Sequence, residues 1–285
     1  MKSGNKKLFA RRPAWSHKGQ YGYVFIVAGS SIHSGSPVFN ALAALRSGAD
    51  LAIVAGPERA MNIAASFAPD ILTYPLDGEL VLKHTPAILE QLERYHSLVI
   101  GCGLRRSEDT YRAIRRIVGE SHKPIVIDAE AIRAIAKDKD ILVDKSVILT
   151  PHAEEFRVLT GEVVMPDVKE RVAKVKKWAG KLGAVILLKG HVDVVSDGKE
   201  VFLNKTGSPF MTKGGFGDAL SGICGAFLAR GIEPFRAACL AAYANGLAGE
   251  RACRLYGEGV LASDIFQHLP DVINTIFQKK LDKGR

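Results

Sequence analysis

Three glycines in four positions precede an acidic residue in Lys213-Gly214-Gly215-Phe216-Gly217-Asp218. Glycines allow a tight turn and let backbone N–H groups approach a ligand closely. Apolar residues then recur with helical spacing at Leu220, Ile223 and Phe227, which predicts a helix that ends near Gly231. A helix N-terminus combines free N–H groups with the positive end of the helix dipole. The segment therefore predicts an anion site of the phosphate-binding kind.

The carboxylate of Asp218 allows two interpretations. An acidic side chain in the first turn stabilises a helix by about 0.3–1 kcal/mol, and this structural role alone would not require three preceding glycines. Beside a bound phosphate, the same carboxylate becomes a candidate general base for a hydroxyl that attacks phosphorus. We favour the catalytic interpretation. The segment is not a Walker A motif, because no Gly-Lys-Ser/Thr follows at the required spacing.

Short apolar runs alternate with amphipathic stretches along the chain, a pattern typical of a parallel sheet that is covered on both faces. The predicted strands are Tyr23–Ala28, Leu51–Ala55, Leu98–Gly101, Ile125–Asp128, Val147–Thr150 and Val185–Leu188. A hairpin is predicted over Asp193–Ser196 and Glu200–Leu203, turned by Asp197-Gly198. The clearest helical stretches are Val38–Ser47, Ser107–Val118 and Asp167–Leu182. We expect an α/β fold with a single doubly wound, mostly parallel sheet and helices on both faces. Residues 1–285 would form one domain, with a basic and flexible end over residues 1–14.

Residues able to do chemistry collect directly after the predicted strands. They are Gly29-Ser30, Gly56-Pro57, Gly101-Cys102-Gly103, Asp128, Thr150-Pro151-His152 and Lys189-Gly190. In open α/β sheets, ligands bind outside the carboxyl ends of the strands. We therefore expect the functional site along this one edge. Structural roles stay open for Asp128 and His152 as helix caps, for Lys189 as a solvated charge at a strand end, and for Gly103 as a turn residue.

The formal charge of +9 fits either attraction of an anionic ligand or a generally basic surface. The basic residues are dispersed and no nucleic-acid motif occurs, so no nucleic-acid partner is expected. Four cysteines without CxxC spacing predict neither a zinc site nor a disulfide framework. The N-terminus lacks the apolar stretch of a signal peptide, and glycines and Pro37 interrupt the uncharged run 19–45. No membrane association and a cytoplasmic location are expected.

Several segments together resemble one enzyme family. They are His17-Lys18-Gly19, Gly29-Ser30, Ala44-Leu45-Arg46-Ser47-Gly48, Gly101-Cys102-Gly103-Leu104, Asp128-Ala129, Thr150-Pro151-His152-Ala153-Glu154-Glu155-Phe156, Leu188-Lys189-Gly190, Asn204-Lys205-Thr206-Gly207-Ser208-Pro209, the turn at residues 213–218, and Leu261-Ala262-Ser263-Asp264-Ile265. In this order, over residues 15 to 278, the chain is similar to the ADP/ATP-dependent NAD(P)H-hydrate dehydratases of the ribokinase-like superfamily.

The resemblance implies a repair reaction on NADH or NADPH whose nicotinamide ring has taken up water. A phosphoryl group passes from ADP or ATP to the ring hydroxyl, and phosphate then leaves to restore the reduced cofactor. Magnesium is implied, because such transfers need charge neutralisation, but the sequence identifies no metal ligand. The resemblance also implies a homo-oligomer, with a tetramer as the expected form.

The resemblance also assigns roles to residues. It makes Asp218 the base and the N–H groups around Gly214, Gly215 and Gly217 the phosphoryl site. The nucleotide would contact Lys189, Gly190, His191, Val192, Asp193 and Gly217. The hydrated cofactor would contact Ser36, Pro37, Gly103, His152, Asn204 and Asp218, with Glu155 close by.

Two departures from the family pattern affect substrate details. Phe216 stands where the family usually has Thr, and Ser36-Pro37 where two alanines are common. The companion epimerase domain of bifunctional members is not expected in this chain. A ribokinase-like kinase that acts on a vitamin-precursor alcohol is the alternative, because it shares the Gly-Gly-x-Gly-Asp turn. A nucleotide sensor without catalytic activity is a third hypothesis, for which Phe216 is the support.

Overall fold

A computed structural model describes residues 12–282 of the chain. Their strands form one sheet in the order β3-β2-β1-β4-β5-β6-β7-β8-β9. All pairs from β3 to β7 are parallel, whereas β8 and β9 pair antiparallel. The strands are β1 Tyr23–Val27, β2 Leu51–Pro57, β3 Leu72–Leu76, β4 Ser97–Ile100, β5 Ile125–Ile127, β6 Val147–Leu149, β7 Val185–Leu188, β8 Asp193–Ser196 and β9 Val201–Asn204.

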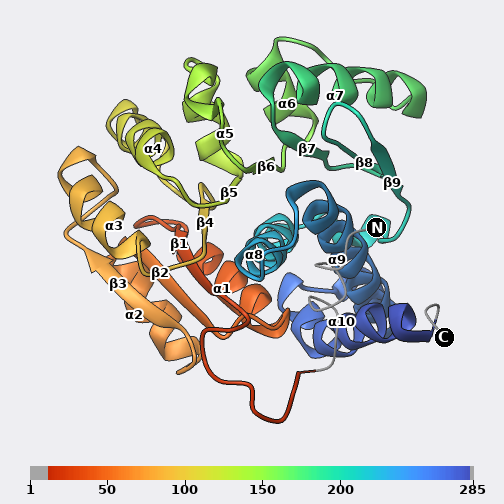
Figure 1. The fold of residues 1–285 in the computed structure, drawn as a ribbon, viewed down its shortest axis with the longest axis horizontal. Helices are drawn as coiled ribbons and strands as arrows, with labels where there is room; N and C mark the ends of the chain where they lie inside the picture. The colour runs from red at the N-terminus through yellow and green to blue at the C-terminus, as the bar shows by residue number, and fades with distance from the viewer. Residues whose placement is uncertain (1–11, 283–285) are drawn as a thin grey trace.

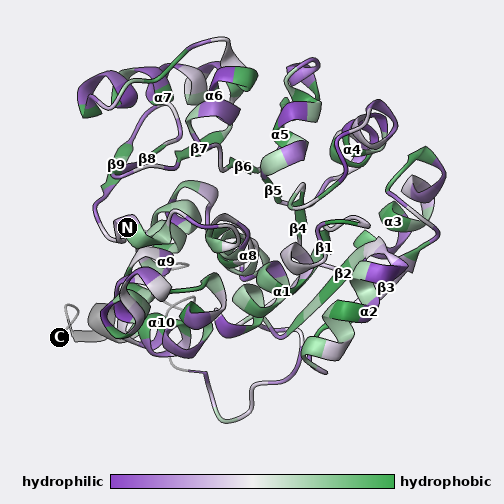
Figure 2. Ribbon diagram, turned by 180° about the vertical axis from the view of Figure 1, so that it is seen from behind, coloured by the Kyte–Doolittle hydropathy of each residue, from purple (hydrophilic) through white to green (hydrophobic). Residues whose placement is uncertain are grey.

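Helices cover both faces of the sheet (Figure 1). One face packs against α1 Gly35–Arg46, α2 Glu58–Phe67, α8 Phe216–Ala229, α9 Pro234–Tyr256 and α10 Ile265–Asp282. The other face packs against α3 Thr85–Leu92, α4 Glu108–Glu120, α5 Ala129–Ile135, α6 Ala153–Thr160 and α7 Val168–Leu182. Successive residues of β1 belong to the two cores in turn, because alternate side chains of a strand point to opposite faces. Figure 2 shows apolar strands and outer helices with polar outward faces.

This architecture confirms the predicted α/β fold with a mostly parallel sheet. All six predicted parallel strands are present, and the hairpin turns at Asp197-Gly198, where Gly198 has a φ of +91°. One edge strand, β3, was missed. It contains Pro75 and is largely solvent-facing, so it lacks the apolar run that identified the others. Proline is tolerated there because an edge strand can leave one hydrogen-bonding side unpaired.

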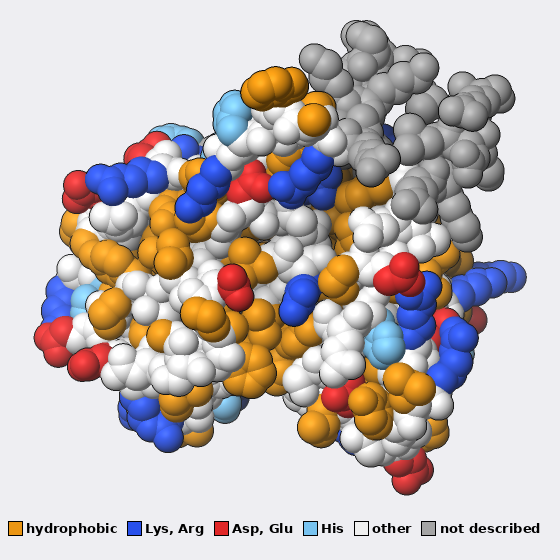
Figure 3. Space-filling view, turned by 90° about the horizontal axis from the view of Figure 1, so that it is seen from below, with side chains coloured by type: hydrophobic (Ala, Val, Ile, Leu, Met, Phe, Trp, Pro, Cys, Tyr) orange, Lys and Arg blue, Asp and Glu red, His pale blue; other side chains and the backbone are white. Residues whose placement is uncertain are grey.

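Parts of the predicted N-terminal end and of the surface can also be placed. Residues 1–11 of the predicted flexible end lie outside the described residues, but Arg12 is held by Asp50 at 2.9 Å. On the face shown in Figure 3, lysine and arginine side chains are dispersed among carboxylates and apolar side chains. Within the described part of the chain, no helix combines the length and hydropathy needed to cross a membrane.

Helix α8 packs unusually closely against its neighbours. A Cβ added at Gly222 would lie 2.2 Å from the carbonyl oxygen of Asn40 in α1. A Cβ at Gly225 would lie 2.4 Å from Cγ2 of Val99 in β4. The two glycines therefore let α8 approach both α1 and the sheet. This approach fixes the position of the first turn of α8.

We predict that Gly222→Ala destabilises the protein by about 1–3 kcal/mol, because the added methyl group must push two backbones apart. Gly119→Ala is the matched control, because Gly119 is also helical and a Cβ there meets nothing within 4 Å. The control should gain stability or leave it unchanged, since alanine favours helix more than glycine does. Urea unfolding of both variants measures the effect. Equal stability of the two variants would contradict the close packing of α8.

Candidate active site

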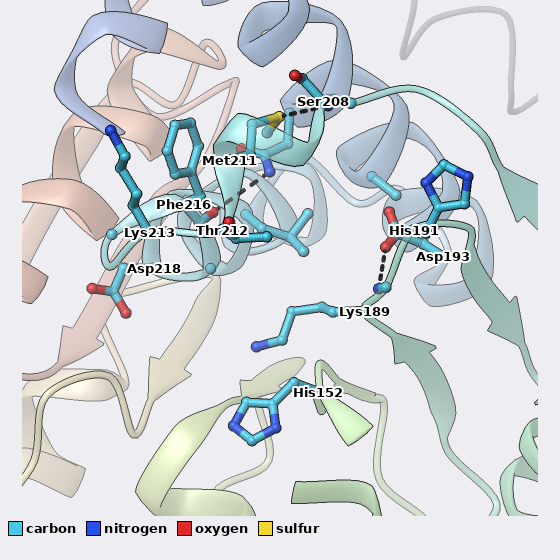
Figure 4. A pocket seen from close by; sticks show the side chains of 18 of the residues that line it. His152, Lys189, His191, Asp193, Ser208, Met211, Thr212, Lys213, Phe216 and Asp218 are labelled. Carbon is cyan, nitrogen blue, oxygen red and sulfur yellow. Dashed lines mark hydrogen bonds between the residues drawn. The ribbon is translucent and has the colours of Figure 1, made fainter. Parts of the chain in front are cut away.

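A cleft of about 720 Å³ opens at the carboxyl edge of the sheet. Residues that follow β5, β6 and β7 form one side of it, and residues 205–220 with part of α9 form the other. Its size is in the range of small-molecule sites. Figure 4 shows His152 and Lys189 on one side of the cleft and Asp218 with the glycine-rich segment on the other. The predicted edge of the sheet is thus the location of the cleft.

The glycine-rich turn forms the N-terminus of α8. Gly215 is the N-cap and has a φ of +101°, a conformation that side chains rarely adopt. A Cβ at Gly215 would also lie 2.7 Å from Cβ of Ala262. A Cβ at Gly217 would lie 3.4 Å from Nζ of Lys189, so this position faces the lysine across the cleft. The turn therefore presents the positive end of a 14-residue helix next to an ammonium group, which suits a phosphate.

A buried ion pair joins the ends of two strands. Nζ of Lys189, after β7, lies 3.0 Å from Oδ1 of Asp128, after β5, and 3.7 Å from Oε2 of Glu155. Oγ of Ser221 in α8 donates a hydrogen bond of 2.7 Å to Oδ2 of Asp128. Asp128 is the N-cap of α5 but makes no side-chain capping bond. The interpretations of Asp128 as a helix cap and of Lys189 as a solvated charge are therefore wrong.

The electrostatics of this pair favour both charged forms. Burial opposes the charge on Lys189, but Asp128 and Glu155 outweigh it and raise the pKa of Lys189. Burial likewise opposes ionisation of Asp128, but Lys189 and the hydroxyl of Ser221 lower its pKa. The next residue, Ala129, has a φ of +48°, which is rare for a residue other than glycine. Such backbone strain is common at functional sites.

The carboxylate of Asp218 is half-buried in the first turn of α8. Burial and the negative charge of Asp128 raise the pKa of Asp218. Hydrogen bonds from Ser36 and Cys102, together with the charge of Lys189, oppose this increase. A carboxylate with a raised pKa is a stronger base than an ordinary aspartate. Asp218 thus has the environment of a general base.

His152 both caps a helix and lines the cleft. Its Nδ1 accepts hydrogen bonds from the backbone N–H of Glu154 at 3.1 Å and of Glu155 at 3.3 Å. Glu155 completes the capping box by accepting from the backbone N–H of His152 at 2.8 Å. Nε2 of His152 lies 3.3 Å from Oε1 of Glu155. The capping interpretation of His152 is confirmed, and its half-exposed ring also borders the cleft.

The predicted nucleotide segment forms another part of the wall. Gly190, His191 and Asp193 line the cleft, and the backbone N–H of Gly190 donates to Oδ1 of Asp193 at 2.9 Å. Val192 is half-buried and is not among the lining residues. Asn204 is buried and donates to Oδ2 of Asp193 at 2.9 Å, so it braces the segment from behind. Burial raises the pKa of Asp193.

Three residues predicted to contact the hydrated cofactor lie outside the cleft, on the α1 side of Asp218. A Cβ added at Gly103 would lie 2.6 Å from Oγ of Ser36, and the hydroxyl of Ser36 acts to lower the pKa of Asp218. Pro37 is buried and packs against Gly29. Ser36, Pro37 and Gly103 do not line the cleft itself. They adjoin Asp218 on the α1 side.

The sequence analysis did not assign Lys205, Lys213 or Asn245 to the site, although all three line the cleft. Lys213 donates hydrogen bonds to the carbonyl oxygens of Glu258 and Val260, which anchors the start of the glycine-rich turn. Asn245 of α9 donates to the carbonyl oxygen of Phe216 at 3.5 Å, while its own Oδ1 has no hydrogen-bond partner within residues 12–282. An amide inside the apolar helical run was the available signal for Asn245. Lys205 also lines the cleft, beside the segment predicted to contact the cofactor.

The sheet order and a solved structure together define the class of fold. The chain resembles a ribokinase-like superfamily protein from Enterococcus faecalis with a TM-score of 0.80 and 23% identity, over 95% of this chain and 94% of the other. The fold is therefore ribokinase-like. A shallower depression along α2, lined by Asn62, Ile63, Ser66 and Phe67, carries no titratable group.

The family follows from closer relatives. A sequence model of the NAD(P)H-hydrate dehydratase family matches residues 24–271, and the chain belongs to this family. An ADP-dependent (S)-NAD(P)H-hydrate dehydratase from Cenarchaeum symbiosum is 38% identical over 272 residues, 94% of each chain. The Bacillus subtilis ADP/ATP-dependent NAD(P)H-hydrate dehydratase, co-crystallised with ATP and Mg²⁺, has a TM-score of 0.79 at 29% identity, over 94% of each chain.

A longer relative is also similar to the chain. The bifunctional NAD(P)H-hydrate repair enzyme Nnr of Pyrobaculum aerophilum is 44% identical over 270 residues, which are 93% of this chain and 53% of that protein. The chain spans about half the length of the bifunctional relatives that it matches.

Proposed function

We propose that the chain catalyses the nucleotide-dependent dehydration of hydrated NADH or NADPH. The observation that carries the proposal is the position of Asp218, a carboxylate with a raised pKa in the first turn of a helix whose N-terminus faces Lys189. Base, phosphate site and charge-neutralising cation thus meet in one cleft. Family membership supplies the substrate class, and the ADP-dependent relative supports ADP as the donor.

The proposed reaction proceeds in two stages. Asp218 takes the proton of the ring hydroxyl as its oxygen attacks the terminal phosphorus, and the bond from phosphorus to the nucleotide oxygen breaks. Backbone N–H groups at Gly215 and Gly217 hold the transferring phosphoryl group. The C–O bond then breaks with its electron pair on phosphate, and loss of the adjacent ring proton restores the double bond. Phosphate leaves easily where hydroxide would not, so phosphorylation makes the dehydration possible.

The two substrates would enter from different sides of Asp218. The nucleotide would lie along Lys189, Gly190, His191 and Asp193, with its phosphates toward the glycine-rich turn. The hydrated ring would approach Asp218 from the side of Ser36 and Gly103, with His152 bordering the cleft across from the carboxylate.

Magnesium would accompany the nucleotide rather than occupy a preformed protein cage. Mg²⁺ commonly keeps several waters and binds through one or two carboxylates plus substrate phosphates. Glu155 would be the carboxylate in this role, because it lines the cleft and burial raises its pKa in spite of the nearby Lys189. The nearby trio Cys102, Asp128 and Asp218, whose ligand atoms lie within 4.8 Å of one another, does not fit. Burial keeps the thiol of Cys102 protonated, and Lys189 already neutralises Asp128. Mg²⁺ would supply charge neutralisation of the phosphates.

Product analysis distinguishes this reaction from that of a small-molecule kinase. Phosphorus NMR of the protein with hydrated NADH, Mg²⁺ and ADP should show AMP and inorganic phosphate formed in equal amounts. A kinase of the same fold would instead form a stable phosphate ester from hydroxymethylpyrimidine or hydroxyethylthiazole. Accumulation of such an ester, without phosphate release from hydrated NADH, would contradict the proposal.

We further propose a cytoplasmic enzyme that forms a homo-oligomer, with a tetramer as the expected assembly.

A further inference from the structure

One buried amide connects three elements beside the proposed base. Asn40 of α1 is completely buried. Its Nδ2 donates to the backbone carbonyl oxygen of Asp218 at 2.7 Å and to Sγ of Cys102 at 3.3 Å. The amide thereby connects α1 to the first turn of α8 and to Cys102, which lies in the loop after β4. One donor contact is thus to Asp218 itself, and the other is to Cys102, which lies beside the Asp218 carboxylate.

The thiol of Cys102 lies between two carboxylates. Its Sγ donates to Oδ2 of Asp128 at 3.5 Å, and the sulfur lies within 4.8 Å of a carboxylate oxygen of Asp218. Burial and the two negative charges raise the pKa of Cys102 well above its ordinary value, so the sulfur keeps its proton. Because Asn40 donates to the sulfur, the single S–H hydrogen remains free to point at a carboxylate. Asn40 therefore orients the thiol as a donor.

The second polar atom of Asn40 argues against a purely stabilising role. Oδ1 of Asn40 is buried and has no hydrogen-bond partner among the described residues. A buried acceptor without a partner costs stability, and an apolar side chain of the same size would avoid that cost. An asparagine whose donors both serve the surroundings of Asp218, at the expense of its own acceptor, is the pattern of a residue that supports function rather than folding.

We propose that Asn40 and Cys102 are positioning residues for Asp218. Asn40 fixes the first turn of α8 and the direction of the thiol, and Cys102 supports the Asp218 carboxylate from the side of β4. The inference rests on the proposed function of Asp218 as the base. It adds two residues, on α1 and after β4, that do not line the cleft.

The contact also affects the protonation of Asp218. The groups around this carboxylate are Asp128 after β5, Lys189 after β7, Cys102 after β4 and the hydroxyl of Ser36 in α1. The thiol donor favours the ionised form, so its removal raises the pKa of Asp218 further. The active, deprotonated base is then lost at a higher pH. The acidic limb of the rate profile should move toward neutral pH.

Three variants test the inference. Asn40→Leu keeps the number and branching of the side-chain heavy atoms but removes both donor contacts, Cys102→Ala removes the thiol, and Cys102→Ser restores a donor. We expect kcat to fall about tenfold or more in the first two, as for the loss of one positioned hydrogen bond, with KM for both substrates nearly unchanged. Cys102→Ser should recover most of kcat. The control Cys253→Ala, on α9, should keep wild-type kinetics and pH profile.

Thermal unfolding separates positioning from folding. Asn40→Leu should unfold at the wild-type temperature or above it while kcat falls, because the orphaned acceptor is gone. A fall in kcat that matches a loss of folded protein would contradict the proposal, as would unchanged kcat in both Asn40→Leu and Cys102→Ala. If Asn40→Leu does not fold, the comparison of Cys102→Ala with Cys102→Ser still decides the question.

One readout does not require turnover. The pKa of Asp218, followed by carbon-13 NMR of its carboxyl group, should rise in Cys102→Ala and remain near the wild-type value in Cys253→Ala. An unchanged pKa in Cys102→Ala would overturn the inference. A wild-type protein that does not dehydrate the substrate would instead contradict the proposed function, so the two failures are distinguishable.

Discussion

Asp218→Asn should lower kcat by about 10²–10⁴-fold, the range for removal of a general acid–base catalyst. Asparagine has the same shape but cannot take the proton of the ring hydroxyl, so attack on phosphorus slows. The backbone N–H groups of the glycine-rich turn remain in place, and nucleotide affinity should change little. Single-turnover kinetics with hydrated NADH and ADP, together with ADP titration, measure both quantities.

The surface variant Asp70→Asn provides the control for this experiment. Asp70 is exposed between α2 and β3, far along the sheet from the cleft. Its replacement should leave turnover and nucleotide binding unchanged. Wild-type turnover by Asp218→Asn would show that another group accepts the proton. A loss of ADP binding in Asp218→Asn would show that the carboxylate acts in binding rather than in proton transfer.

Lys189→Met should lower the free energy of unfolding by about 3–5 kcal/mol, because it leaves the carboxylate of Asp128 buried without its charge partner. The same change removes the ammonium group from beside Gly217, so the rate of phosphoryl transfer should also fall. Chemical unfolding and steady-state kinetics test the two effects separately. Lys176→Met, on the exposed side of α7, should change stability by less than about 0.5 kcal/mol.

A double variant tests whether Lys189 and Asp128 stabilise the protein as a coupled pair. Lys189→Met combined with Asp128→Asn removes both charges and should recover much of the lost stability, while activity stays low. The free energy of unfolding also depends on pH with a defined sign. Because the folded protein lowers the pKa of Asp128, the stabilisation from its ionised carboxylate is present above the ordinary aspartate pKa and is lost as the pH falls through the lowered pKa. Additive destabilisation in the double variant would contradict a coupled pair.

The parts of the site that could be predicted are those encoded locally. The glycines before Asp218 and the apolar spacing after it indicate a helix N-terminus from a few adjacent residues. Lys189 and His152 could be assigned to the site because each directly follows a buried strand, and a parallel sheet brings such positions to one edge. The order of the strands was not needed for these assignments.

The partners within the site could not be predicted, because they depend on strand order and on helix packing. Asp128 pairs with Lys189, 61 residues away, since β5 and β7 flank β6. Asn40 meets Asp218 across 178 residues, since glycines let α1 and α8 pack closely. In the sequence, Asn40 is one polar residue in a helical stretch. Its role depends on the neighbours that the tertiary structure brings to it.

The most direct test of the central claim is the near-ultraviolet absorbance of dihydronicotinamide, followed after the protein is mixed with hydrated NADH, Mg²⁺ and either ADP or ATP. The hydrated ring lacks this absorbance band, so restoration of the double bond is observed without a coupled assay. A nucleotide-dependent rise that Asp218→Asn abolishes is the predicted result, and the faster nucleotide identifies the donor. No rise with either nucleotide, using hydrate that another dehydratase converts, would contradict the assignment of this cleft as a dehydratase active site.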